Sequence, residues 1–159
     1  MTRQVMTALL VSACSVATAG AADSKPPASP NPPAIDKARA LFKQYVDLEH
    51  AFDVAVADLY SDDAVIKNKR TYPTGQVREM AFPAPQYKAL IRQAMPLAKQ
   101  AGDTSTYTDC KYAPEAEHVR ITCTRYSERK KYSSPISLLV GAGKNGKWLI
   151  LEELSASQP

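Results

Sequence analysis

The chain is poor in the residues that metal and phosphate sites require. Its two histidines, His50 and His118, lie far apart in the sequence, which argues against a zinc site. Three of its six glycines fall in the run "GAGKNGK" at 141–147, which is typical of a hairpin turn and not of a phosphate-binding loop. A serine-nucleophile motif of the G-x-S-x-G kind is missing. We therefore expect no metal and no cofactor.

Neither sign of charge dominates the sequence. Twenty Lys and Arg against sixteen Asp and Glu give a net charge of +4, and a dedicated nucleic-acid binder carries a denser basic footprint. We expect no nucleic-acid partner. The basic run at 125–132 ("RYSERKKY") is expected to be a solvated loop. The alternative is a surface for anionic headgroups, glycan or an acidic protein, with "KNKR" at 67–70 as its second edge.

No apolar run is long enough to span a bilayer as a permanent helix. Residues 1–22 combine Arg3, a short apolar stretch and small residues, which is typical of a secretory signal peptide. The run "LVSAC" resembles the lipobox of bacterial lipoproteins, and we favour a signal ending at Ala13 with lipidation of Cys14. The alternative is ordinary cleavage after 17–19 or 19–21. Either way we expect export to the periplasm, with membrane contact only through a lipid anchor.

The sequence indicates one folded domain after a spacer. The stretch 24–34 has five prolines in eleven residues, so residues 23–33 are predicted to form a Pro-rich linker. The domain is expected over 34–159, and its length suffices for a single hydrophobic core.

The hydrophobic pattern predicts helices first and strands later. Apolar residues at spacings of three and four predict a long helix over 35–52, and Asp53 is suited to cap a shorter helix that ends near Tyr60. A strand at 64–66, a turn at 71–76 and a return strand lead to a third helix, which begins near Pro83 and which Pro96 should kink or end. The remaining runs predict an antiparallel meander and an α+β fold; they are 104–112, 118–126, 134–142 and 147–154.

This order of elements resembles the nuclear transport factor 2-like superfamily. The local likeness is strongest at Tyr45-Val46 and at "LYSDDAV" (59–65), which are similar to segments of ketosteroid isomerases and polyketide cyclases. The resemblance implies a cone in which three N-terminal helices pack on a curved, mostly antiparallel sheet. It also implies that Asp62 and Asp63 are a structural joint at the end of the second helix and not a catalytic pair.

The resemblance favours binding over catalysis. The position that matches the isomerase base is Asn68, whose amide cannot accept a proton at neutral pH. Tyr45 matches the tyrosine that donates to the oxyanion in those enzymes, and without a base it is better interpreted as a pocket-lining donor. The expected ligand-binding residues are Tyr45, Asn68, Tyr107, Tyr126 and Trp148.

Strand alternation makes Glu152 a candidate acid–base residue. Trp148, Ile150 and Glu152 share a face of the last strand if the alternation is regular. If that face is concave, Glu152 would lie in the cavity and would join Tyr45 as a candidate catalytic residue. A solvated glutamate at the rim is the alternative.

Two cysteines remain once Cys14 is set aside. If 104–112 and 118–126 pair through a four-residue loop at 115–118, Pro114 lies opposite Val119 and Cys110 lies opposite Cys123. Directly opposed residues point to the same face at a separation that suits a disulfide, and export favours its oxidation. The sequence therefore predicts a Cys110–Cys123 disulfide.

We expect a non-catalytic periplasmic binding module. It would capture a small hydrophobic ligand, or an envelope or secreted protein, through its cavity or its sheet face, and it could form a homodimer through the sheet. One alternative is a small-molecule isomerase, cyclase or dehydratase that uses Tyr45 and Glu152. Another is an immunity or inhibitor lipoprotein directed against a secreted toxin.

Overall fold

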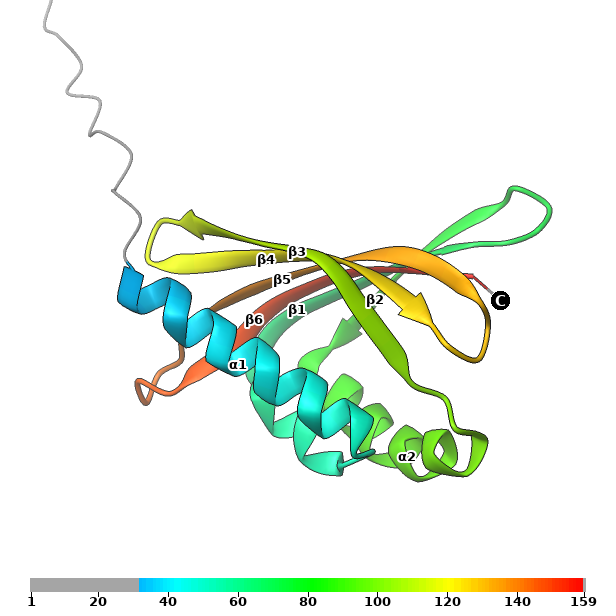
Figure 1. Ribbon diagram of the computed structural model, residues 1–159, viewed down its shortest axis with the longest axis horizontal. Coiled ribbons are helices and arrows are strands. Elements are labelled where there is room, and N and C mark those ends of the chain that lie inside the picture. Colours follow the sequence, from blue (N-terminus) through cyan, green and yellow to red (C-terminus); the bar gives the residue numbers. More distant parts are fainter. Residues whose placement is uncertain (1–31, 159) are drawn as a thin grey trace, which may run out of the picture.

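The computed structural model describes residues 32–158 (Figure 1). Its elements are α1 (Pro32–His50), the 3-10 helix η1 (Val54–Leu59), β1 (Tyr60–Thr71), β2 (Val77–Pro83), α2 (Ala84–Ala101), β3 (Ser105–Glu115), β4 (His118–Ser127), β5 (Tyr132–Ala142) and β6 (Trp148–Ser157). The expected signal peptide, the Cys14 lipidation site and almost all of the linker lie outside the described residues. Helix α1 begins two residues before the expected domain start at 34.

Six strands form one sheet in the order β2-β1-β6-β5-β4-β3. Both α1 and α2 lie on one side of this sheet (Figure 1), so the α+β expectation is confirmed. The last four strands form the expected antiparallel meander. The sequence did not indicate that β6 returns beside β1, where the two strands run parallel.

The core lies between the helices and the inner face of the sheet. Alternate residues of β4 and β5 are buried there, because successive side chains of a strand point to opposite faces. Helix α1 contributes one buried stripe at spacings of three and four. These buried residues are Ala38, Leu41, Phe42 and Tyr45 of α1, Val119, Ile121 and Cys123 of β4, and Ile136, Leu138 and Val140 of β5.

Local signals account for most of the helix ends. Phe52 has a φ of 55° just after α1, and the Asp53 side chain accepts a hydrogen bond from Ala55 N at 2.8 Å. The predicted second helix is therefore present, as a short 3-10 helix. Gly102 ends α2 in the left-handed conformation that glycine adopts at low cost. Pro96 lies inside α2 without ending it, since the helix continues through Ala101.

The acidic pair lies inside β1, beyond the end of η1. Lys88 Nζ of α2 lies 2.6 Å from Asp62 Oδ1, and Lys144 Nζ lies 2.6 Å from Asp63 Oδ2. Lys88 also donates to the carbonyl oxygen of Tyr60 at 3.2 Å. The pair is exposed, and its contacts join distant segments, whereas the sequence-based expectation was bonding to nearby backbone.

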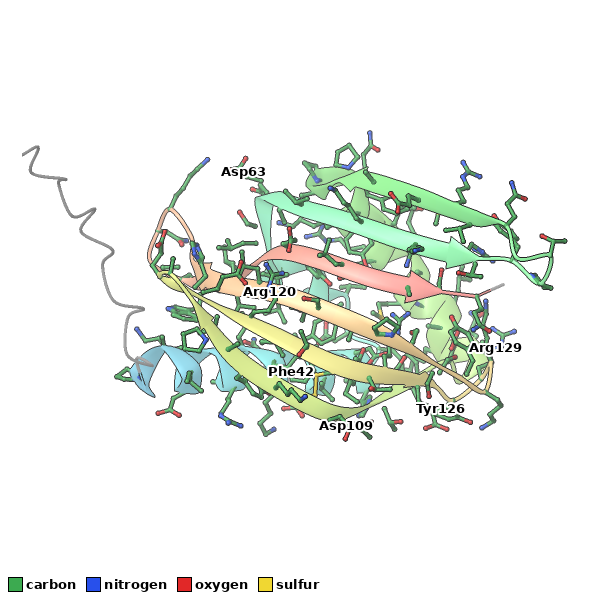
Figure 2. The ribbon with its side chains drawn as sticks, turned by 90° about the horizontal axis from the view of Figure 1, so that it is seen from above. Phe42, Asp63, Asp109, Arg120, Tyr126 and Arg129 are labelled. Atoms are coloured by element: carbon green, nitrogen blue, oxygen red, sulfur yellow. A yellow bond between two sulfur atoms is a disulfide. The ribbon has the colours of Figure 1, made fainter. Side chains whose placement is uncertain are left out.

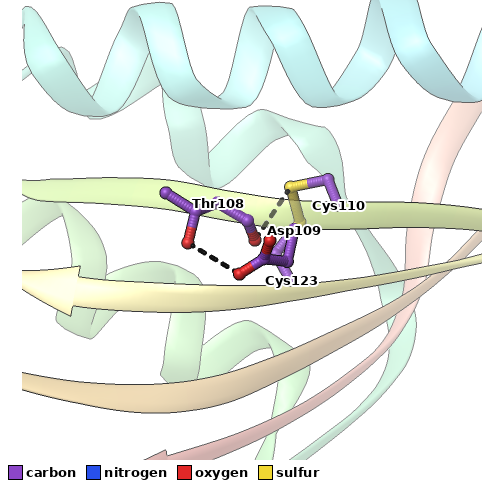
Figure 3. The surroundings of a disulfide bond; sticks show 4 residues. All are labelled: Thr108, Asp109, Cys110 and Cys123. Atoms are coloured by element: carbon purple, nitrogen blue, oxygen red, sulfur yellow. Dashed lines mark hydrogen bonds between the residues drawn. A yellow bond between two sulfur atoms is a disulfide. The ribbon is translucent and has the colours of Figure 1, made fainter.

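The β3–β4 hairpin contains the predicted disulfide, Cys110–Cys123, with a Cα–Cα distance of 4.3 Å (Figure 3). Pro114 pairs with Val119, as the sequence predicted. Two details differ. Glu115 and His118 themselves pair, which shortens the connection to two residues, and the register shifts between Thr108 and Lys111. The disulfide is thus held at a β-bulge.

Candidate ligand-binding site

A buried carboxylate lies at the centre of the space between the helices and the sheet. Glu153 of β6 is 2% exposed. Its Oε2 accepts a short hydrogen bond from the Tyr60 hydroxyl, and its Oε1 accepts one from the Tyr87 hydroxyl at 3.1 Å. Burial, and after it the charge of Glu153, raises the pKa of both hydroxyls well above a tyrosine's ordinary value. Both carboxylate oxygens are therefore occupied by donors that stay protonated.

A bulge in β6 decides which glutamate lies inside. Val140 pairs with Ile150, but the next pair along the ladder joins Leu139 to Glu152. One extra residue on β6 reverses the alternation beyond it. Glu153 consequently lies on the inner face with Ile150, and Glu152 lies on the outer face.

The expectation that Glu152 serves the cavity is corrected by its contacts. Its Oε1 accepts from Arg120 Nη1 at 2.5 Å. Arg120 also donates from Nε to Glu115 at 2.9 Å. These residues form an ion-pair group on the outer face, which is the face toward the viewer in Figure 2, where Arg120 is labelled.

Two of the expected ligand-binding residues, Tyr45 and Tyr107, lie in contact with each other. Their ring centroids lie 6.0 Å apart, and Tyr107 also packs edge-on against Phe42 at 5.5 Å. Tyr45 is only 8% exposed. Burial, and then the charge of Glu153, raises its pKa above the ordinary tyrosine range. Tyr45 is thus an aromatic core residue with a protonated hydroxyl.

A polar pocket of about 280 Å³ opens beside this aromatic cluster. It lies where the C-terminal end of α1, the start of β3 and the ends of β1, β4 and β6 meet. We call it the mouth pocket. Its lining residues are Glu49, Arg70, Asp103, Ser105, Arg125, Ser127, Lys130, Tyr132, Ser157 and Gln158.

Three cationic side chains line the mouth pocket. Arg125 Nη2 donates to the carbonyl oxygen of Ala156 at 3.0 Å, which anchors the guanidinium against β6. Lys130 Nζ donates to the carbonyl oxygen of Gln158 at 3.4 Å. The guanidinium of Arg70 lies 5.6 Å from the ring centroid of Tyr72. Neutral groups thus hold the three cations in place, and the same lining contains two acids, Glu49 and Asp103.

Unpartnered polar atoms concentrate at the same place. Among the described residues, the buried side-chain atoms that lack a hydrogen-bond partner in the protein are Glu49 Oε2, Arg70 Nε and Thr104 Oγ1. Glu49 and Arg70 line the mouth pocket, and Thr104 lies between two lining residues. A buried donor or acceptor that lacks a hydrogen-bond partner costs about 1–3 kcal/mol of stability. Such atoms take their partner from water or from a ligand.

Glu49 differs from an ordinary surface glutamate. Burial raises the pKa of its carboxyl. Four weaker effects lower that pKa without cancelling the effect of burial: the hydrogen bond of Ser105, the charge of His50, the hydrogen bond of Tyr107 and the charge of Arg125. A titratable group with a perturbed pKa in a pocket is a candidate for binding or proton transfer.

The other predicted site residues are spread over the molecule. Asn68 donates to Ser155 Oγ at 2.9 Å and accepts from Ser157 Oγ at 2.8 Å, so it holds a residue of the mouth pocket without lining it. Trp148 lies near Lys37, whose Nζ is 5.8 Å from its ring centroid. Tyr126 lies on the face of β4 opposite the core (Figure 2). These residues do not form one site.

Sequence reasoning missed Glu49 and Glu153. It named Arg70 and Arg125 only as parts of the basic runs 67–70 and 125–132, whose alternative role was a surface for anionic groups. Regular alternation from Ile121 and Cys123 also places Arg125 on the inner face. Glu49 lies one helical turn after Tyr45, at the spacing that shares a helix face. Glu153 had no such signal, since the bulge that turns it inward leaves no mark in the sequence.

No metal site or membrane-spanning helix is found in the described part of the chain. Between residues 32 and 158, no three His, Cys, Asp or Glu side chains gather in a way that could hold a metal ion. Neither α1 nor α2 has the length and apolar character that crossing a bilayer takes.

The chain matches no protein-family model and no curated protein. Solved structures are nevertheless similar to it. An NTF2-like protein of unknown function from Pseudomonas putida KT2440 superposes with a TM-score of 0.62 at 11% identity, over 80% of this chain and 88% of that one. An NTF2-like protein with a cystatin-like fold from Novosphingobium aromaticivorans gives 0.54 at 15% identity, over 78% and 81%.

A third similar structure has a different kind of name. A chain of naphthalene 1,2-dioxygenase with indole bound gives a TM-score of 0.59 at 10% identity, over 81% of each chain. Identities this low show a shared fold and do not carry an activity from one protein to another. Together with the helices on one face of a mostly antiparallel sheet, these likenesses establish that the chain has the nuclear transport factor 2-like fold.

Proposed function

We propose that this protein is an exported, non-catalytic binding protein that captures a small anionic ligand in the mouth pocket. The observation that carries the proposal is the pairing of anchored cations with unpartnered buried atoms, above all Arg70 Nε, in one concave site. Small-molecule sites typically combine a concave shape with a few convergent polar groups. Export is supported by the signal-like segment at 1–22.

The polarity of the lining changes the expected ligand. Sequence reasoning favoured a hydrophobic molecule, but the mouth pocket is lined by three cations, two acids, three serines, a tyrosine and a glutamine. A purely apolar ligand would leave these groups desolvated and unpaired, which disfavours binding. An anion offers Arg70 and Arg125 the acceptors that their guanidinium groups require.

A non-catalytic role is supported by the contacts of the buried and candidate catalytic side chains. Glu153 is a fully buried carboxylate, and both its oxygens already accept tyrosine hydroxyls. Tyr45 and Glu152, the catalytic pair considered from sequence, lie on opposite faces of the sheet. Asn68, at the position of the isomerase base, is bonded to serines.

The test is a binding screen on the exported chain, purified from the envelope of a bacterial host. Acetate, succinate, citrate, phosphate and sulfate would be compared by thermal shift and then by calorimetry. Arg70→Gln should weaken the best ligand at least about tenfold, the loss of one charge-assisted hydrogen bond. Arg39→Gln, at an exposed position of α1 outside the pocket lining, is the matched control and should bind as the wild type does. Failure of every anion to bind would contradict the proposal.

An acid–base enzyme is the second candidate, and Glu49 favours it. Its raised pKa and unpartnered Oε2 are properties of a general acid or base. In that case turnover of a small molecule would depend on Glu49 and would fall by about 100-fold or more in Glu49→Gln. Full turnover in that variant would dismiss the enzyme candidate.

The proposed homodimer would use the outer face of the sheet. Val65 and Leu154 are exposed there at 48% and 39%, and exposed apolar side chains that cluster favour association. Light scattering on the purified chain, with Leu154→Lys as the disrupting variant, tests this proposal. A monomeric wild type would contradict it.

A further inference from the structure

We infer that the mouth pocket takes up a small oxyanion together with one proton, which Glu49 carries, so that capture strengthens as the pH falls. The inference rests on the binding function proposed above and adds to it the regulation of the site. The oxyanion is a carboxylate or a phosphate, because both offer the planar or tetrahedral oxygens that guanidinium groups bind.

The cationic side of the pocket is already in position. Arg125 is anchored by hydrogen bonds from Nη2 to Ala156 O at 3.0 Å and to Ser134 Oγ at 3.5 Å. Arg70 stacks over Tyr72 and has a buried Nε without a partner. Guanidinium groups stay charged at any pH the protein meets. An oxyanion in the pocket would therefore supply the acceptor that Arg70 Nε lacks, next to a guanidinium of Arg125 that is already held in place.

The acidic side of the pocket sets the condition on binding. Glu49 Oε2 is buried and unpartnered in the same lining. An ionised carboxylate is only an acceptor, so its charge would repel a bound oxyanion and no hydrogen bond could form between the two. A protonated carboxyl has one O–H to donate, and an O–H···O⁻ hydrogen bond is among the stronger kinds. The same oxygen thus opposes the ligand in one protonation state and binds it in the other.

The groups around Glu49 come from four elements and from the connections before β3 and β5. Helix α1 contributes Tyr45 and His50. Strand β3 and the residues before it contribute Asp103, Ser105 and Tyr107, β4 contributes Arg125, and the loop before β5 contributes Lys130. Arg70 faces the pocket from β1.

His50, the neighbour of Glu49 in the chain, is the second group in this set that can carry a proton. Its Nε2 lies 2.7 Å from the carbonyl oxygen of Ser105, so that nitrogen is a donor, and it does not line the mouth pocket. It is therefore the alternative proton carrier that a test must separate from Glu49.

The pKa of Glu49 is shifted in the direction that favours the protonated, donating form. Burial raises it above the ordinary glutamate value of about 4.3, so part of the population is protonated at pH values where other surface carboxylates are ionised. A ligand that binds only the protonated form raises this pKa further by linkage. Above the pKa of Glu49, the affinity should fall by up to about tenfold per pH unit.

Calorimetry on the full exported chain tests the inference with acetate, phosphate and sulfate as probes. Titrations would run from about pH 6.5 to about pH 8, where acetate and sulfate stay essentially fully ionised. Repeating each titration in two buffers of different ionisation enthalpy counts the protons taken up. We expect uptake of up to one proton with acetate or sulfate. The three probes also show whether a planar or a tetrahedral oxyanion is preferred.

Two variants locate the proton. Glu49→Gln keeps the shape of the side chain and mimics the neutral form, so it should bind with no proton uptake and an affinity that no longer depends on pH. His50→Gln should retain the proton uptake of the wild type. Circular dichroism confirms that each variant is folded, and the wild-type proton count stands even if a variant fails to fold.

The outcomes separate the inference from the proposed function. If neither the wild type nor Glu49→Gln binds any probe at any pH, the binding function itself is wrong. If the wild type binds without taking up a proton, or if Glu49→Gln keeps the wild-type pH dependence, the binding function stands and the inference is overturned. Loss of proton uptake in His50→Gln alone would assign the proton to His50 and would also overturn it.

Discussion

The hydroxyl of Tyr60 in β1 donates a hydrogen bond to the Glu153 carboxylate in β6, across a sequence separation of 93 residues. Both residues are 2% exposed. The Tyr87 hydroxyl of α2 donates to the other carboxylate oxygen. One buried acid thus joins two neighbouring strands to the helix that covers them, through hydrogen bonds from two tyrosines.

Removing one of these donors should destabilise the fold. Tyr60→Phe leaves a buried carboxylate oxygen without its donor, which should lower the free energy of unfolding by about 1–3 kcal/mol. Tyr87→Phe should act in the same direction, and the double variant should be non-additive because both donors serve one acceptor group. Urea unfolding measures each value. Tyr126→Phe, on the outer face, is the control and should change stability by less than about 0.5 kcal/mol; equal losses in all three variants would contradict the role of Glu153.

The disulfide should be a main source of stability in the hairpin. Replacing Cys110 and Cys123 together by serine removes a cross-link that closes a loop with a sequence separation of 13. The chain-entropy model then predicts a loss of about 3 kcal/mol. Chemical unfolding with and without reductant measures it, because reductant should destabilise the wild type and leave the double variant unchanged. Two reactive thiols from these positions in the denatured, unreduced wild type would show that the bond is absent.

Glu49 should make stability depend on pH. Its folded-state pKa is raised by burial, so its contribution is fully present below the unfolded pKa and is lost as the pH rises through the folded pKa. Glu49→Gln should therefore have a higher melting temperature than the wild type at about pH 7, and the difference should disappear near about pH 4. Thermal unfolding across this range measures the effect. Glu117→Gln, with an 81% exposed side chain, is the control; an equal effect there would contradict the assignment to Glu49.

Lipidation of Cys14 stays a prediction from the sequence. If the signal ends at Ala13, the mature protein should partition into the membrane fraction, and Cys14→Ser should release it, because several acyl chains anchor a protein firmly. Fractionation with mass analysis of the mature N-terminus measures this. A soluble wild type that begins after residue 19 or 21 would show ordinary cleavage instead.

The sequence by itself determined the elements and much of their pairing. Helical spacing identified α1 and α2, and Asp53 identified the start of η1. The register of Pro114 opposite Val119 followed from turn length and alternation, and it led to the disulfide. These features depend on a few neighbouring residues, whose backbone preferences and side-chain periods are visible in a single chain.

Only the tertiary structure decided which residues form the candidate site. The bulge at Leu151 turned Glu153 inward and Glu152 outward, and a bulge depends on packing between strands that sequence alternation cannot anticipate. The mouth pocket joins Glu49, Arg70 and Arg125, which come from a helix and two strands that are not neighbours in the sheet. Their proximity depends on the parallel return of β6 beside β1 and on the path of α1 across the sheet. Contacts between residues so distant in the chain leave no local pattern, because each residue type alone is as common on a solvated surface as in a site.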